Sequence, residues 1–202
     1  MSFQEFLDWK PETGRYELHN GAVAEMQPTG PHEQVVGLLN RKLNVLIDQE
    51  NLNVFIPNTA LVRPLGTETG YKPDILMIDR AALAQEPPWE RESVITLGSS
   101  VRLVVEVTST NWPDDYARKF EDYEAMGIAE YWILDYRGLG GRRYIGSPKH
   151  QHSPTGCAHR AARNSENRGL QQSGAIGITT LGFSLIKSLV SNGDELFYRC
   201  LS

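Results

Sequence analysis

The segment Val101–Val107, VRLVVEV, constrains the fold most because it is the most apolar run in the chain. A strand with one wet face alternates apolar and polar residues, whereas a nearly continuous apolar run is typical of a strand covered on both faces. Residues 74–78 (DILMI) and 130–136 (EYWILDY) also read as strands, and residues 53–63 contain a further strand signal. The sequence therefore predicts a central sheet buried between other layers.

Helical patterns alternate with these strands. Residues 29–49 begin with a helix entry that has proline in its first turn, and apolar residues then follow at helical spacing. A second helix is predicted from Pro113 to about Gly127. Asn20-Gly21, between two short extended segments, is typical of a type I′ hairpin, which we expect to open the domain. The order indicates a mixed α/β (α+β) fold, with a central mixed sheet flanked by helices and an N-terminal β-hairpin.

The character of the chain changes near residue 146. Residues 147–174 contain almost no large apolar side chains and no periodicity, so they cannot add much to a core. Residues 175–190 are apolar again and predict a strand or a short helix. We expect one domain over residues 1–146, followed by a divergent, partly low-order C-terminal tail over residues 147–202.

Composition excludes several classes of protein. The two cysteines, Cys157 and Cys200, form no cluster that indicates a disulfide framework or a zinc site. No run of eighteen apolar residues and no apolar leader occurs, so we expect a cytoplasmic protein without a membrane partner. The net charge of -5 argues against a protein that coats nucleic acid, but it is compatible with carboxylates that hold a metal ion.

Two carboxylates are placed where a cation would be needed. Glu106 lies inside the apolar strand, where an ionised side chain requires a partner. Asp74 follows Pro73 at the start of another strand, where an acid can point into a cleft. Mg²⁺ usually takes one or two protein carboxylates and completes its shell with water and phosphate oxygens. Asp74 and Glu106 are therefore candidate ligands for Mg²⁺ or Mn²⁺.

The second helix supplies a candidate amine. At 100° per residue, Lys119 falls within the apolar stripe that includes Phe120 and Tyr123. A lysine on the packing face of this helix can reach back toward Glu106. Its ammonium group could orient a nucleophilic water or stabilise the negative charge that develops on phosphorus.

These residues carry a family resemblance. Asp74, Glu106 and Lys119, in the contexts YKPDILMI, LVVEVTS and ARKFEDYEAMG, resemble the PD-(D/E)XK nuclease superfamily, and within it the restriction-endonuclease-like Uma family. The resemblance extends from residue 15 to about residue 143. It implies a restriction-endonuclease-like core and metal-dependent cleavage of DNA, with Asp74 and Glu106 as metal ligands and Glu17 as a further catalytic carboxylate. Because such domains often act in pairs, it also implies a homodimer.

The chain departs from the superfamily motif at one position. The usual lysine lies two residues after the second acid, where this chain has Thr108. The nuclease interpretation therefore requires Lys119 to supply the amine from the helix.

Each candidate residue also has a purely structural interpretation. Glu106 and Lys119 could form a buried ion pair that joins helix to sheet, Asp74 could cap a turn, and Glu17 could be solvated. His32 lies on the apolar face of its helix, which favours a core histidine. Two other functions stay open: a catalytically inactive nucleic-acid-binding or assembly module, and a metal-dependent hydrolase of smaller phosphodiesters or nucleotides.

Overall fold

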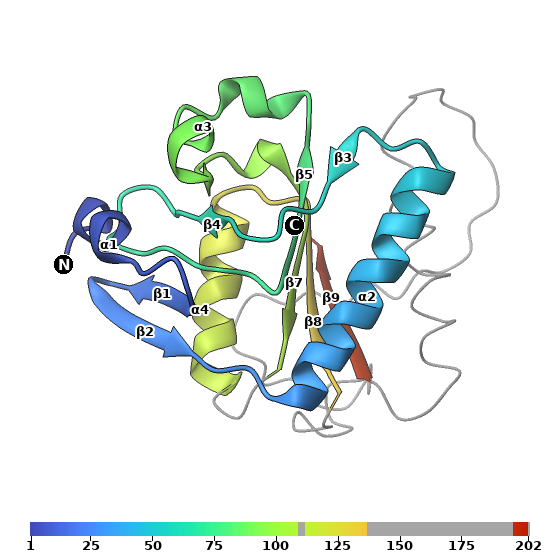
Figure 1. Cartoon of the computed structure of the whole chain (residues 1–202), viewed down its shortest axis with the longest axis horizontal. Coiled ribbons are helices and arrows are strands. Elements are labelled where there is room, and N and C mark those ends of the chain that lie inside the picture. Colours follow the sequence, from blue (N-terminus) through green and yellow to red (C-terminus); the bar gives the residue numbers. More distant parts are fainter. Residues whose placement is uncertain (109–111, 137–195, 202) are drawn as a thin grey trace, which may run out of the picture. The chain divides into compact units, whose positions relative to one another are not determined.

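The computed structural model describes residues 1–108, 112–136 and 196–201 (Figure 1). The chain forms two compact units, Met1–Leu134 with Arg199–Ser202, and Asp135–Tyr198. Few residues of the second unit are described, so the fold given below is that of the first. The expected domain boundary at residue 146 and the element expected over residues 175–190 both lie outside the described residues.

The order of elements follows the predicted alternation. The α-helices are α1 (Phe3–Trp9), α2 (Gly30–Gln49), α3 (Trp89–Glu92) and α4 (Trp112–Ala125). The strands are β1 (Arg15–His19), β2 (Ala22–Met26), β3 (Val54–Phe55), β4 (Leu61–Val62), β5 (Ile75–Asp79), β6 (Val94–Ile95), β7 (Val101–Val107), β8 (Glu130–Asp135) and β9 (Leu196–Leu201). Two short 3₁₀ turns, η1 (Ala82–Gln85) and η2 (Gly98–Ser100), connect β5, β6 and β7.

The large sheet is mixed, as predicted. Its strand order is β3-β5-β7-β8-β9, with β5 antiparallel to both β3 and β7, and β7 parallel to β8. Every residue of β7 is buried except Arg102. Figure 1 shows α2 and α4 on opposite sides of this sheet, which explains why β7 is apolar on both faces.

Helix α2 confirms the predicted boundaries. Thr29 is its N-cap and a proline occupies the first turn, where the missing N–H costs no hydrogen bond. Its buried residues recur at helical spacing: His32, Leu39, Leu43, Leu46 and Ile47. None of the described helices is long and apolar enough to cross a membrane.

The N-terminal hairpin is present, but it does not open the domain. Asn20 and Gly21 have φ values of 49° and 83°, the pair of positive angles that a type I′ turn requires. Helix α1 precedes the hairpin and begins with a capping box between Ser2 and Glu5. Its seven residues were missed because they are too few to show a helical period. The α1 side chains Phe3 and Phe6 pack against Leu18, Leu61 and Val94.

The hairpin is attached to the rest of the unit by backbone pairing. Leu18 forms an antiparallel bridge with Gly70, with both backbone hydrogen bonds present at 2.9 and 2.8 Å. This bridge brings the neighbouring residue Glu17 beside the segment that leads into β5.

Candidate active site

Asp74 and Glu106 lie side by side at one end of the sheet. Ile75 pairs with Val105 in the antiparallel register of β5 and β7, so the next position along places Asp74 opposite Glu106. Directly opposite residues of antiparallel strands point to the same face. Asp74 is also fastened to the end of β7, because its Oδ2 accepts a hydrogen bond of 2.8 Å from the backbone N–H of Val107.

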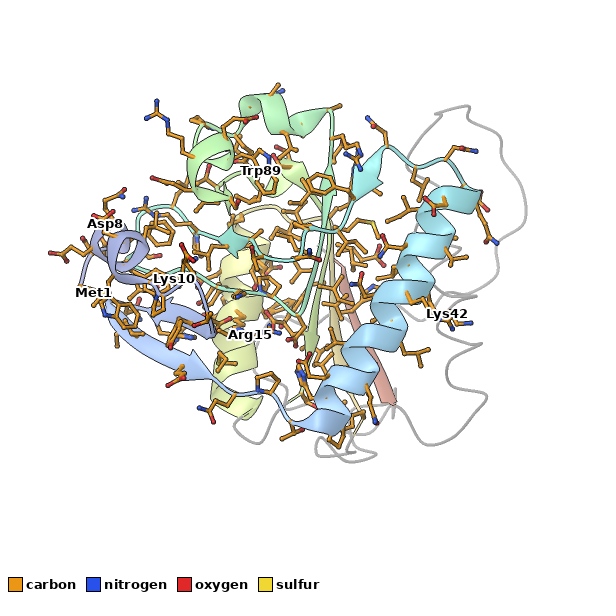
Figure 2. The ribbon with its side chains drawn as sticks, viewed as in Figure 1. Met1, Asp8, Lys10, Arg15, Lys42 and Trp89 are labelled. Atoms are coloured by element: carbon orange, nitrogen blue, oxygen red, sulfur yellow. The ribbon has the colours of Figure 1, made fainter. Side chains whose placement is uncertain are left out.

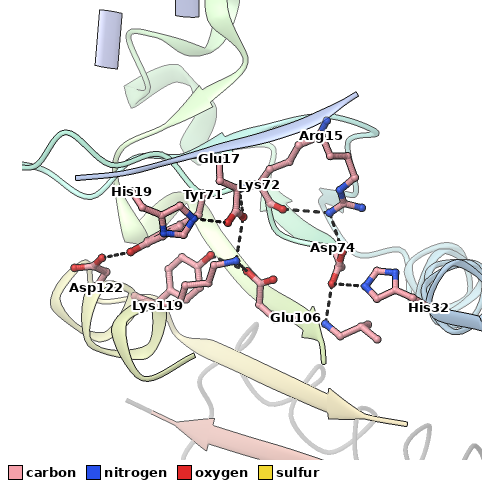
Figure 3. Close-up of polar contacts among 12 residues, drawn as sticks. Arg15, Glu17, His19, His32, Tyr71, Lys72, Asp74, Glu106, Lys119 and Asp122 are labelled. Atoms are coloured by element: carbon pink, nitrogen blue, oxygen red, sulfur yellow. Dashed lines mark hydrogen bonds and ion pairs between the residues drawn. The ribbon is translucent and has the colours of Figure 1, made fainter. Parts of the chain in front are cut away.

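Two further side chains hold Asp74. Arg15 of β1 donates from Nη2 to Oδ1 at 2.8 Å, and His32 of α2 places Nε2 at 3.2 Å from Oδ2 (Figure 3). Burial of Asp74 acts to raise its pKa, but the hydrogen bond from His32 and the charge of Arg15 outweigh it and lower the pKa. Asp74 is therefore ionised at neutral pH.

Lys119 reaches from α4 to two carboxylates. Its Nζ lies 3.0 Å from Oε1 of Glu17 and 3.3 Å from Oε1 of Glu106, and the residue is only 1% exposed. Figure 3 shows the amine between these two acids. Tyr123, one helical turn further along α4, donates its hydroxyl to the same Glu106 oxygen at 3.0 Å.

Glu17 is completely buried and strongly hydrogen-bonded. Besides Lys119, it accepts a bond of 2.9 Å from the backbone N–H of Lys72, and its Oε2 lies 3.0 Å from His19 Nε2. Burial acts to raise its pKa, but the charge of Lys119 and these hydrogen bonds together lower the pKa to about 2. The hairpin thus contributes an ionised carboxylate to the cluster.

The pKa of Glu106 shifts in the opposite direction, upward. Burial raises its pKa to about 8 despite the nearby charge of Lys119, and repulsion from Asp74 and Glu17 adds to the increase. Between about pH 2 and pH 8 the ammonium of Lys119 is therefore balanced by Glu17, while Glu106 holds a proton. Ionising Glu106 would place one negative charge too many in the cluster.

The donor types and the charge of this cluster suit a divalent cation. Two adjacent carboxylates match the small protein ligand set that Mg²⁺ takes, and the cation would neutralise the surplus charge of an ionised Glu106. The side chains of Asp74 and Glu106 are 7% and 6% exposed, so neither is sealed completely. Within the described residues, no group of three or more His, Cys, Asp or Glu side chains could hold a metal. The two carboxylates by themselves match only the small protein share of a Mg²⁺ shell, whose other ligands are water and substrate oxygens.

All four residues expected from the sequence lie in one neighbourhood. Lys119 bonds to both Glu17 and Glu106, and Asp74 lies beside Glu106. Lys119 contacts Glu106, as the structural interpretation expected, but Glu106 holds a proton below about pH 8, so the charged partner of Lys119 is Glu17. Thr108 is buried and brings no charge; its backbone N–H bonds to Leu134.

The sequence did not reveal several members of this network. His32 is buried, as expected of a core histidine, but it also contacts Asp74. Arg15 was overlooked, although it precedes Glu17 by two positions, and residues two apart in a strand share a face. Tyr71 is linked to Asp122 of α4 by a hydrogen bond of 2.5 Å, and its ring lies 5.4 Å from the Lys119 amine. No local signal identified Tyr71, because its partners are far away in the sequence.

Comparison with a solved structure supports the fold. The structure described as a putative nuclease belonging to DUF820 from Anabaena variabilis ATCC 29413 is similar, with a TM-score of 0.50 and 18% sequence identity. The similarity covers 66% of this chain and 73% of that one. At this identity the likeness concerns the fold alone. None of the curated proteins matches the chain.

A family profile provides the more specific result. The profile of Uma2, described as putative restriction endonuclease, matches residues 3–156. This range contains Glu17, Asp74, Glu106 and Lys119, and it covers most of the chain. The chain therefore belongs to the Uma2 family of restriction-endonuclease-like proteins.

Proposed function

We propose that this protein is a metal-dependent endonuclease that hydrolyses phosphodiester bonds in DNA. One observation carries the proposal: Asp74, Glu106 and Lys119 come together from the start of β5, from β7 and from α4, in a chain of the Uma2 family. In the proposed site, Asp74 and Glu106 hold Mg²⁺ or Mn²⁺. The bound cation supplies positive charge beside the scissile phosphate.

The protein's own groups have separate tasks in this proposal. Lys119 places a fixed positive charge beside Glu106, where it stabilises negative charge that develops on the phosphate oxygens. Glu17 keeps Lys119 charged and in place through their 3.0 Å contact. Arg15 and His32 keep Asp74 ionised and oriented. Glu106 must lose its proton before it can act as a ligand, since metals bind the carboxylate form.

The direct test is cleavage of supercoiled plasmid and of labelled DNA duplexes by the purified full chain. Mg²⁺ or Mn²⁺ should support cleavage and EDTA should abolish it. Asp74→Asn, Glu106→Gln and Lys119→Met should each reduce the rate about 100-fold or more. Asp79→Asn is a matched control, because Asp79 lies at the other end of β5 and pairs with Arg102.

The outcomes separate the three functions. DNA binding without cleavage under any metal condition would identify an inactive binding module on the same fold. Hydrolysis of nucleotides or small diesters, with DNA left intact, would identify a hydrolase of smaller substrates. Full activity in Asp74→Asn would discard the proposed site. A homodimer and a cytoplasmic location stay predictions from the sequence.

A further inference from the structure

We propose that Lys10, Arg15 and Lys72 form a phosphate-binding rim, here called the basic rim, that holds the nucleic acid backbone next to the cleavage site. This inference rests on the proposed function, because it assigns the substrate contacts beside that site. The three residues come from the end of α1, from β1 and from the segment before β5. Figure 2 labels Lys10 and Arg15 on the side of the molecule that carries the hairpin.

Arg15 connects the basic rim to the carboxylates. Its Nη2 donates to Asp74 at 2.8 Å and to the carbonyl of Lys72 at 3.2 Å (Figure 3). The side chain is 23% exposed, and in the described part of the chain its hydrogen bonds use Nη2 alone. A guanidinium group has five N–H donors in a planar fork that suits phosphate oxygens. Arg15 can therefore bind Asp74 on one side and a phosphate on the other.

Lys72 and Lys10 extend the positive charge beyond Arg15. Lys72 is partly buried, and its Nζ bonds only weakly, at 3.4 Å, to the carbonyl of Gly14. Lys72 lies next to Arg15, because Arg15 bonds to its carbonyl and its own amine bonds to the residue before Arg15. Burial lowers the pKa of Lys72, the charges of Arg15 and Lys10 lower it further, and the charge of Glu17 acts to raise it. Among the described residues, neither lysine has a carboxylate partner within ion-pair distance.

Arg15 pairs with Asp74, but two neighbouring lysines without an ion-pair partner among the described residues are unusual in a chain with a net charge of -5. Such a cluster is costly without an anion, and a polynucleotide offers phosphates on both sides of the one that is cut. A nucleoside monophosphate offers only one phosphate group to the three residues. The basic rim therefore fits the repeated phosphates of a nucleic acid backbone, which position a substrate without reading its sequence.

The test measures binding separately from cleavage. Fluorescence anisotropy of a short labelled DNA duplex is recorded in EDTA over a series of salt concentrations, with the full chain. Each phosphate contact contributes about 0.9 to the slope of log affinity against log salt. Lys10→Gln combined with Lys72→Gln should lower this slope by about 2 and should weaken binding equally for unrelated duplex sequences. Glutamine keeps a donor for the Gly14 carbonyl.

The matched control is Arg41→Gln combined with Lys42→Gln, which removes two positive charges from α2. Figure 2 shows Lys42 on this helix, away from Lys10 and Arg15, and it lies about 15 Å along the helix axis from His32. The control should leave the slope unchanged. Thermal unfolding of both double variants tests whether they are folded. If the Lys10/Lys72 variant is unstable, Lys10→Glu alone, at the half-buried C-cap of α1, should still weaken binding.

Each outcome decides the proposal. An unchanged slope in the Lys10/Lys72 variant, an equal drop in the α2 control, or no DNA binding by the parent protein would overturn it. The same anisotropy titration with a labelled single-stranded RNA shows whether the protein binds the backbone of DNA or of RNA. Normal rim-dependent binding without cleavage would reject the endonuclease function while leaving the basic rim standing.

Discussion

Replacing Lys119 with methionine tests the charge arrangement of the site without any substrate. Methionine keeps most of the side-chain length and removes the amine that lies 3.0 Å from Glu17 and 3.3 Å from Glu106. The substitution leaves a buried charge without its partner only at the carboxylate that is ionised. At about pH 6, between the pKa of about 2 for Glu17 and about 8 for Glu106, only Glu17 carries a charge.

The expected loss of stability is large for a single substitution. Removing one partner of a buried ion pair costs about 3–5 kcal/mol, because the other charge is left without compensation. Glu17 keeps its contacts with His19 and with the backbone N–H of Lys72, so a cost near the lower end, about 3 kcal/mol, is expected. This is a substantial part of the roughly 5–15 kcal/mol that stabilises an ordinary domain.

A second substitution, added to Lys119→Met, shows whether Glu17 or Glu106 carries the negative charge. Adding Glu17→Gln to Lys119→Met removes the unpaired charge and should recover most of the loss, to within about 1 kcal/mol. Adding Glu106→Gln should recover little, because Glu106 is already protonated at this pH. Glu17→Gln alone should cost less than Lys119→Met, since Glu106 can ionise and pair with Lys119 in its place.

Chemical denaturation in EDTA at about pH 6 measures these free energies of unfolding. Arg118→Met is the control, because Arg118 is the exposed neighbour of Lys119 on α4 and its loss should change stability by no more than about 0.5 kcal/mol. Recovery by Glu106→Gln rather than Glu17→Gln would refute the assignment of the proton to Glu106. A negligible cost for Lys119→Met would refute the buried position of its amine.

Three further predictions concern pH, metal and the hairpin. Folded Glu106 has a pKa of about 8 against an ordinary 4.5, so it retains a proton that the unfolded chain releases between these values. Its contribution to stability is therefore complete below about pH 4.5 and is lost as pH rises through about 8; Glu106→Gln should flatten this decline in denaturation curves. Because metals bind the carboxylate form, Mn²⁺ should raise the Tm more at about pH 9 than at about pH 6, and Asp74→Asn should remove this difference in calorimetry. Gly21→Ala should lower the free energy of unfolding by about 1 kcal/mol or more, because Gly21 has a φ of 83° and an added Cβ would lie 3.1 Å from the Met1 carbonyl oxygen; an unchanged value would argue against the type I′ turn.

Elements with a strong local signal were predictable. The apolar run of β7, the capped and periodic α2, and the Asn20-Gly21 turn are each written in a short stretch of sequence. The strand signal within residues 53–63 corresponds to β3 and β4, but the sequence did not predict the two-residue strand β6, or the pairing of β3 with β5 and of β4 with β6, because these pairings join distant segments. The same holds for β9, which follows a long segment without a clear pattern.

The candidate site was predictable in its residue types but incompletely in its contacts. Local context marked Asp74, Glu106 and Lys119, because each is polar in a place where neighbours indicate burial or a strand end. The hydrogen bond between Lys119 and Glu17 joins residues 102 positions apart, and the one between His32 and Asp74 joins residues 42 positions apart. Periodicity in the sequence is a local pattern, so it predicts neither of these contacts.

By itself, the sequence determined that two acids and a lysine would lie in or beside a buried sheet, since hydrophobic patterning places side chains on a face. Only the tertiary structure decided how they are charged. Glu17 and Glu106 are the same residue type and contact the same amine, yet the pKa of one is lowered and that of the other is raised. The difference arises because desolvation and Coulomb energy depend on distances between groups that are remote in the chain, and folding alone sets those distances.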